Sequence, residues 1–235
     1  VRKTVAAFKS MLRDGVDFRE KYAATPRWNS MRIIFAVAAF FDLDLELNDV
    51  VAFFLAASLE DSEKIFMEQD SRTDDHSGRI CRLIKSMYGL SQAAYHSQRM
   101  LMNSLKADDI HQTVTDRAVV VQPSSTPNAP HADVMCSIHR DDSLTTGTKA
   151  GLRNIWASLE KTFKITPETE PSLVIGVQIK RCREHRWLKI HQHGYVLKLL
   201  IQENMLDSRL SSTPINKGMT KQTSYDDGLP DTPAD

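Results

Sequence analysis

Two adjacent aspartates, Asp141 and Asp142, lie where the sequence predicts the tip of a β-hairpin. Residues 134–138 form the arm that leads to them, and residues 144–147 form the returning arm. Side-chain alternation places the apolar residues of the first arm on one face, and His139 and Asp141 on the other. Carboxylates displayed in this way can hold a hard divalent cation. An Asp-Asp pair is also ordinary turn chemistry, so the pattern alone leaves both interpretations open.

A third carboxylate, Asp49, lies in a strand candidate at residues 45–51, on the same predicted face as Leu45 and Leu47. A carboxylate in line with apolar side chains is a local conflict, and such conflicts often mark functional sites. An aspartate at the fraying end of a strand would give the same pattern.

The order of the elements predicts that Asp49 meets the aspartate pair. The strands are expected at 45–51, 134–139, 143–147 and 172–180, and the helices at 91–107 and 150–164. This βαββαβ order predicts an α+β fold, a ferredoxin-like split motif with an antiparallel sheet and helices on one face. Its first and third strands are central neighbours, so Asp49 and Asp141 would lie together. Carboxylates from two strands suit two-metal phosphoryl transfer.

A further helix is predicted ahead of this motif, capped by Asn29 or Ser30 and ending near Phe41. It is apolar nearly all round, which predicts burial between layers.

Composition sets broad limits on the function. The chain has 235 residues, 41% hydrophobic and 26% charged, as in a soluble globular protein of one large or two small domains. No apolar run approaches the roughly 18 residues of a membrane span. The three cysteines are widely spaced, which favours a reducing compartment and no zinc site. The first residue is Val1 rather than methionine, so we expect a fragment or a piece of a polyprotein.

The formal net charge is zero, whereas a dedicated nucleic-acid binder usually carries a global positive excess. Residues 180–189 nevertheless form a basic run broken by a single acid, Glu184. Such a run can be a solvated face or a track for phosphates, and the sequence leaves both open.

Six collinear segments carry a family resemblance. They are residues 47–55 around Asp49, 65–69 (IFMEQ), 81–93 (CRLIKSMYGLSQA), 139–147 (HRDDSLTTG), 175–179 (IGVQI) and 194–215. In this order they resemble the reverse transcriptase domain of copia-type long-terminal-repeat retrotransposons, over about residues 2 to 215. The resemblance implies an RNA-directed DNA polymerase that transfers a nucleotide from a dNTP to a primer 3′-hydroxyl.

The resemblance also implies a right-hand polymerase fold. Fingers are expected at about 1–44 and 52–90, a palm with the βαββαβ core at about 45–51 and 91–180, and a connecting, thumb-like element at 181–215. The polar tail, residues 216–235, is expected to be disordered. The implied partners are an RNA or DNA template-primer, dNTPs, and the integrase and RNase H regions of the same polyprotein, without a membrane. The implied location is intracellular, in a cytoplasmic virus-like particle or the nucleus.

Carried over residue by residue, the family's metal ligands are Asp49, Asp141 and Asp142 with the Val50 backbone carbonyl. They would hold two Mg²⁺ ions, with Mn²⁺ as an alternative.

The nucleotide-binding residues implied by the resemblance are Phe54, Gln92, Arg2 and Lys3. The Phe54 ring would exclude a ribose 2′-hydroxyl by its bulk, although a phenylalanine here can equally be a core residue. Gln92 would lie beside the incoming nucleotide, and Arg2 and Lys3 would contact its triphosphate.

Two residues depart from the family at the primer-supporting position. Where the family has Tyr-Val before the aspartate pair, this chain has His139 and Arg140. Arg140 shares the parity of Ile138, which predicts that it points toward the core, where an unpaired charge is costly. Catalysis by this chain is therefore left open. The alternative is a catalytically decayed retrotransposon remnant with at most a weak nucleic-acid-binding or interaction role.

Overall fold

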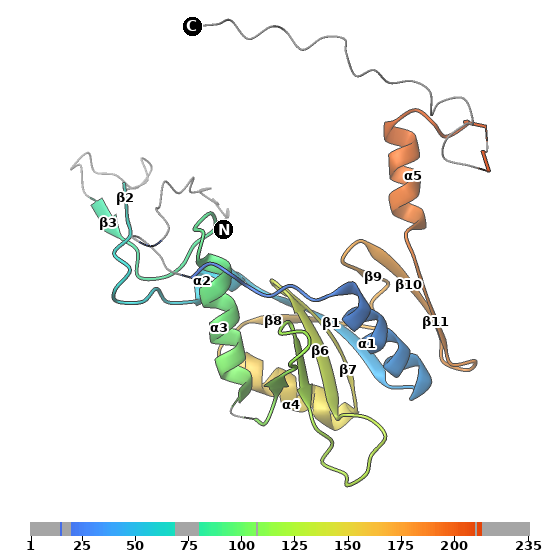
Figure 1. Cartoon of the computed structure of the whole chain (residues 1–235), viewed down its shortest axis with the longest axis horizontal. Coiled ribbons are helices and arrows are strands. Elements are labelled where there is room, and N and C mark those ends of the chain that lie inside the picture. The colour runs from blue at the N-terminus through green and yellow to red at the C-terminus, as the bar shows by residue number, and fades with distance from the viewer. Residues whose placement is uncertain (1–14, 16–19, 69–79, 107, 210, 213–235) are drawn as a thin grey trace, which may run out of the picture. The chain divides into compact units, whose positions relative to one another are not determined.

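The computed structural model describes Gly15 and residues 20–68, 80–106, 108–209 and 211–212. Its elements are α1 (Trp28–Phe40), β1 (Asp44–Val50), α2 (Phe53–Ala56), β2 (Phe66–Glu68), β3 (Ile80–Arg82), α3 (Ala93–Lys106), β4 (His111–Gln112), β5 (Val119–Gln122), β6 (Val134–His139), β7 (Asp142–Gly147), α4 (Lys149–Glu160), β8 (Ile165–Thr169), β9 (Leu173–Val174), β10 (Val177–Cys182), β11 (Trp187–His191) and α5 (His193–Gln202) (Figure 1). Two compact units divide the chain, residues 1–191 and 192–235, and α5 belongs to the second. The predictions made for Arg2, Lys3 and residues 216–235 fall outside the described residues.

An antiparallel six-stranded sheet forms the centre of the first unit, in the order β4-β5-β6-β7-β1-β8. Strand β1 lies between β7 and β8, so the first and third strands of the predicted motif are neighbours. The α+β class and this pairing are confirmed. No helix in the described ranges is long and apolar enough to cross a membrane.

The fourth strand of the motif was predicted at 172–180, which is wrong. Strand β8 (Ile165–Thr169) takes that place beside β1. It lies at the sheet edge, is mostly exposed and contains Pro167, so it lacks the apolar pattern of a central strand. The predicted segment turns instead at Ile175 and Gly176, whose φ angles are 46° and 75°. It forms β9 and β10 of a separate three-stranded sheet, β11-β10-β9.

Helices α3 and α4 cover one face of the six-stranded sheet. Their buried side chains, which include Leu101 and Ile155, pack on Val134, Cys136 and Ile138 of β6. The predicted alternation of β6 is therefore confirmed for its apolar residues.

The opposite face is covered by α1 and the three-stranded sheet, so helices are not confined to one face as predicted. Buried Met31, Ile34, Phe35 and Ala38 of α1 pack on Leu45 and Leu144. The helix is not buried all round, because Ile33 is 55% and Phe40 is 70% exposed.

The N-terminus of α1 is capped from a distant part of the chain. Neither Asn29 nor Ser30 is the N-cap residue, because the helix begins at Trp28 and follows Arg27. The Asp116 carboxylate accepts a hydrogen bond from the Arg27 N–H at 2.8 Å and one from the Ser30 hydroxyl at 2.6 Å. A local sequence pattern cannot predict a cap supplied by a residue 86 positions away.

Candidate active site

Three strands bring acidic and imidazole side chains into one row at the end of the sheet. Asp49 of β1 lies directly opposite Asp142 of β7, and Asp142 lies directly opposite His139 of β6. Residues paired across antiparallel strands project from the same face, with Cβ atoms about 5 Å apart. This is the face that α1 covers farther along the strands.

The predicted parity of the aspartate pair was wrong by one position. Arg140 and Asp141 form a two-residue turn between the paired His139 and Asp142. Arg140 has a φ of 58°, which is left-handed backbone, and the chain reverses within these two residues. Asp142, rather than Asp141, therefore shares the face of His139 and Asp49.

Asp141 lies in the turn itself and is tied to the end of β1. The Val50 N–H donates a hydrogen bond of 2.9 Å to the Asp141 carbonyl oxygen. The Val50 side chain is buried in the cluster beneath α3 and α4. The predicted ligand backbone at Val50 is therefore held beside the turn by a buried anchor.

The carboxylates influence one another electrostatically. Partial burial raises the pKa of Asp142, the charges of Asp141 and Asp49 raise it further, and His139 opposes the shift. Asp49 is exposed, whereas Asp141 and Asp142 are half-buried. Hard oxygen donors of this kind suit Mg²⁺ or Mn²⁺. Within the described ranges, however, no three His, Cys, Asp or Glu side chains converge as a ready-made metal cage.

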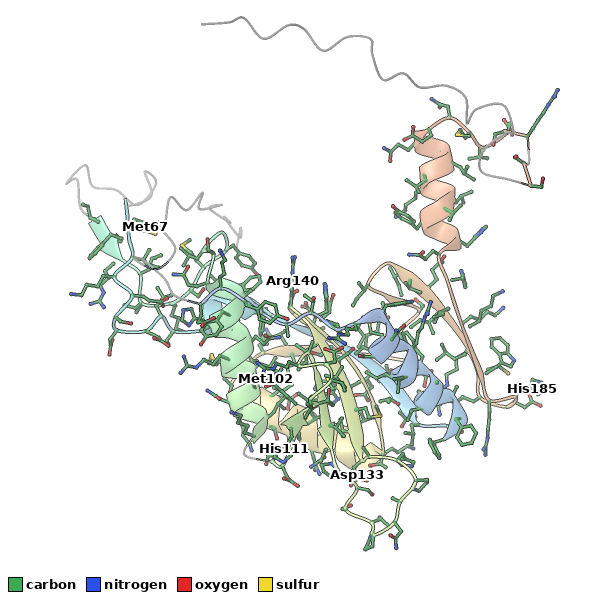
Figure 2. All side chains as sticks on the ribbon, viewed as in Figure 1. Met67, Met102, His111, Asp133, Arg140 and His185 are labelled. Atoms are coloured by element: carbon green, nitrogen blue, oxygen red, sulfur yellow. The ribbon has the colours of Figure 1, made fainter. Side chains whose placement is uncertain are left out.

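Arg140 does not enter the core, as its parity had predicted. Its side chain, labelled in Figure 2, is exposed and lines a cavity of about 380 Å³. The other lining residues come from the segment before α1, from α2, α3 and β6: Lys21, Tyr22, Ala23, Ala24, Thr25, Phe53, Phe54, Ala94, Gln98 and Ile138. Rings and two cationic side chains therefore share this cavity. Lys21 and Tyr22 had not been predicted as site residues, because they lie outside every predicted helix and strand.

Phe54 packs as a core residue and also lines this cavity. Its half-buried ring lies edge-on to Tyr88 with 5.2 Å between centroids, and 5.6 Å from Phe53.

Gln92 lies away from the cavity lining. Its side chain is fully buried just ahead of α3, and within the described residues neither amide atom makes a hydrogen bond. The strand register thus places Asp49, Asp142 and His139 in one row, with Asp141 in the adjoining turn. Arg140 and Phe54 line the same cavity, and Gln92 does not line it.

The sequence matches known proteins over nearly its full length. A model of the family described as reverse transcriptase (RNA-dependent DNA polymerase) matches residues 2–217. The retrovirus-related Pol polyprotein from transposon TNT 1-94 of Nicotiana tabacum is 30% identical over 204 residues, 86% of this chain and 15% of that protein. The corresponding polyprotein from transposon RE1 of Arabidopsis thaliana is 26% identical over 204 residues, 86% of this chain and 13% of that protein. This chain therefore spans about a seventh of the length of these relatives.

Proposed function

The chain belongs to the reverse transcriptase (RNA-dependent DNA polymerase) family, and from this premise we propose that it carries out template-directed DNA synthesis for a retrotransposon Pol polyprotein. The reaction joins a dNTP to a primer 3′-hydroxyl with release of pyrophosphate. The single observation that supports it best is the register that pairs Asp49 with Asp142 beside the Asp141 turn. Strand pairing between distant segments brings Asp49 opposite Asp142, which supports the proposed catalytic site.

Divalent cations fit the donor set of this site. Asp49, Asp141, Asp142 and the Val50 carbonyl would hold two Mg²⁺ ions, or Mn²⁺, because carboxylate and carbonyl oxygens are their preferred ligands. When bound, such ions supply activation of the primer hydroxyl and neutralise charge on the triphosphate. Burial raises the pKa of Asp142, and the charges of Asp141 and Asp49 raise it further, so a bound cation would stabilise the ionised carboxylate.

The cavity beside the aspartate turn is the proposed nucleotide pocket. Its volume, about 380 Å³, is within the range of small-molecule sites. The Phe54 ring would press against the sugar and disfavour a 2′-hydroxyl. Arg140 would supply a positive charge near the phosphates, a role that the family's valine cannot fill.

The polymerase subdomains are proposed along the same lines. Residues 45–51 and 91–180 would form the palm, residues 1–44 and 52–90 the fingers, and residues 181–215 a connecting element. The order of the six-stranded sheet supports the palm assignment. Template-primer and dNTPs are the proposed ligands, and integrase and RNase H regions the proposed neighbours in the polyprotein.

The alternative, a decayed remnant, is favoured by one specific observation. The two residues before the aspartates are His139 and a left-handed Arg140, whereas the family has Tyr-Val. A cation beside the carboxylates competes with metal ions for their charge.

Primer extension separates the two functions. The purified chain is given a primed RNA template, the matching dNTP and Mg²⁺ or Mn²⁺, and the products are resolved by length. We expect extension that Asp141→Asn and Asp142→Asn abolish. The control Asp61→Asn changes an exposed carboxylate outside the site and should extend normally. Extension by the wild type excludes the remnant, and no extension above background with either metal refutes the polymerase.

A further inference from the structure

The hairpin of β10 and β11 has two chemically different faces. Its inner face carries Ile179, Leu188 and Ile190, which pack against the α1 side of the sheet. Side chains alternate along each strand, so Lys180 and Lys189 project from the outer face, and both are exposed. The two lysines are directly opposite each other in the strand register. The outer face thus carries two adjacent ammonium groups.

Two arginines of the same hairpin, Arg181 and Arg183, form ion pairs with nearby acids. The Arg181 side chain is only 7% exposed and pairs with Asp42 at 3.2 Å and Glu170 at 3.3 Å. Arg183 pairs with Asp42 at 3.2 Å and with Asp44 at 2.6 Å. These acids are therefore already engaged with the arginines.

The two lysines of the outer face have no acidic partner of this kind among the described residues. In the part of the chain that the structure describes, neither Lys180 nor Lys189 forms an ion pair within 4 Å. Like charges directly opposite each other destabilise a strand pair, and a bound anion would relieve that repulsion. Glu184 is the only acid in the sequence of the hairpin, 177–191, and Arg186 adds a further cation at its turn. His185, labelled in Figure 2, lies at the same turn.

An aromatic ring lies one row farther along the same face. Trp187 pairs with Cys182, two residues from the lysine pair on each strand, and is 41% exposed. Surfaces that bind single-stranded nucleic acid combine two features. Cationic side chains bind the phosphates, and an exposed aromatic ring stacks against a base. Duplex nucleic acid has its bases already stacked, and an acidic peptide offers no base, so neither uses the indole in this way.

We propose that the outer face of β10–β11, formed by Lys180, Lys189 and Trp187, binds an unpaired stretch of nucleic acid. Lys180 and Lys189 contact backbone phosphates, and a base stacks on the Trp187 indole. The choice of nucleic acid rests on the proposed polymerase function. The surface itself lies outside the carboxylate row and the nucleotide cavity, and it gives a function to the basic run that the sequence left open.

The test is fluorescence anisotropy with the full 235-residue chain and a labelled oligothymidylate. A strand of about twenty nucleotides exceeds the usual site size. EDTA is present and dNTPs are absent, so catalysis plays no part. We expect Lys180→Gln/Lys189→Gln to weaken binding about tenfold and to reduce the salt slope of log K by about 1.4, two phosphate contacts at about 0.7 each. Trp187→Ala should weaken binding about tenfold, and Trp187→Phe much less.

A matched double variant controls for lost charge. Lys149→Gln/Arg153→Gln removes two exposed cations from α4 and should leave the affinity near the wild-type value. Thermal unfolding verifies that each variant is folded. Equal weakening by both double variants, or unchanged binding in Trp187→Ala, overturns the proposal. So does a larger effect of the lysine and Trp187 variants on the binding of a duplex of the same length, or of anionic phosphatidylserine vesicles, than on the binding of the oligothymidylate.

The two proposals fail independently. Loss of primer extension with intact oligonucleotide binding refutes only the polymerase. Intact extension with unchanged oligonucleotide affinity in the lysine variant refutes only the outer surface.

Discussion

At the scale of single residues, the row of Asp49, Asp142 and His139 is expected to favour activity at a cost in stability. Asp142 lies between Asp49 and His139 in the strand register and next to Asp141 in the chain. Two like charges near a half-buried carboxyl make its ionised form costly. A structure selected for stability alone would have no reason to gather them, and functional sites commonly carry such conflicts.

Asp142→Asn should therefore stabilise the fold while abolishing extension. Burial and the charges of Asp141 and Asp49 raise the pKa of Asp142 above its usual 3.8, so the native state binds this proton more tightly than the unfolded chain does. Stability from this group falls as pH rises from 3.8 through the raised pKa. We expect a gain at pH 7 below about 1 kcal/mol, because water screens a carboxyl this open. Urea unfolding should show that the variant's gain in free energy of unfolding disappears below pH 3.8. A variant less stable than the wild type at pH 7 would contradict this prediction.

Arg140 stores backbone strain at the same turn. Its φ of 58° is left-handed, a conformation that costs a non-glycine residue about 1 kcal/mol. Arg140→Gly should raise the free energy of unfolding by about 1 kcal/mol, because glycine adopts this backbone without penalty. Arg140→Val, the residue of the related family, is β-branched and should unfold at lower urea than wild type. Equal midpoints for the two variants would mean that the turn is not strained.

At the scale of elements, long-range polar contacts decide where the structures begin and end. Asp116 caps α1 and also accepts a hydrogen bond from the Ala118 N–H at 3.1 Å, which orders the start of β5. Helix α1 covers the face on which the carboxylates lie. The position of one aspartate between β4 and β5 thus controls the layer packed against the candidate active site.

Asp116→Ala should destabilise the first unit by about 2 kcal/mol at pH 7, because the Arg27 N–H, the Ser30 hydroxyl and the Ala118 N–H lose their acceptor. Burial by itself would raise the pKa of Asp116, but bonds from Ser30, Arg27 and Ala118 outweigh burial and lower it below 3.8. The stabilisation is present above pH 3.8 and is lost as pH falls through the lowered pKa. The gap from wild type in thermal melts should close in that acid range. The control Asp61→Ala removes an exposed carboxylate remote from this cap and should leave the melting temperature at pH 7 near the wild-type value.

At the scale of the first unit, the central sheet is covered on both faces by different means. Apolar packing of α3 and α4 covers one face. On the other, Arg181 of β10 donates a 3.0 Å hydrogen bond to the Ala38 carbonyl at the end of α1, and pairs with Asp42 and Glu170. This arginine joins the three-stranded sheet to α1 and to the segment after β8.

Arg181→Met should lower the free energy of unfolding by about 2 kcal/mol, because a buried carbonyl and two carboxylates lose a charged donor. Most of the hydrophobic stem is kept, so packing changes little. Arg153→Met alters an exposed arginine of α4 and should leave the unfolding midpoint unchanged. The contribution of the ion pairs should shrink in high salt. Identical midpoints for both variants would show that Arg181 does not join the layers.

The sequence by itself determined the class of fold, the family and the approximate meeting of Asp49 with the aspartate pair. These depend on periodicity, element order and collinear motifs, all of which are properties of the chain read in one dimension. Helix α4, predicted at 150–164 and found at Lys149–Glu160, shows how well local spacing defines an amphipathic helix.

Only the tertiary structure decided which residues meet and on which face. Strand β8 has no apolar pattern because an edge strand needs none, and α1 is capped by a residue remote in sequence. Alternation predicted the face of Asp141 wrongly, because a single left-handed residue at Arg140 ends the strand before the parity can continue. The sequence predicted the carboxylates, and the turn geometry determined that Asp142 is the one that faces Asp49.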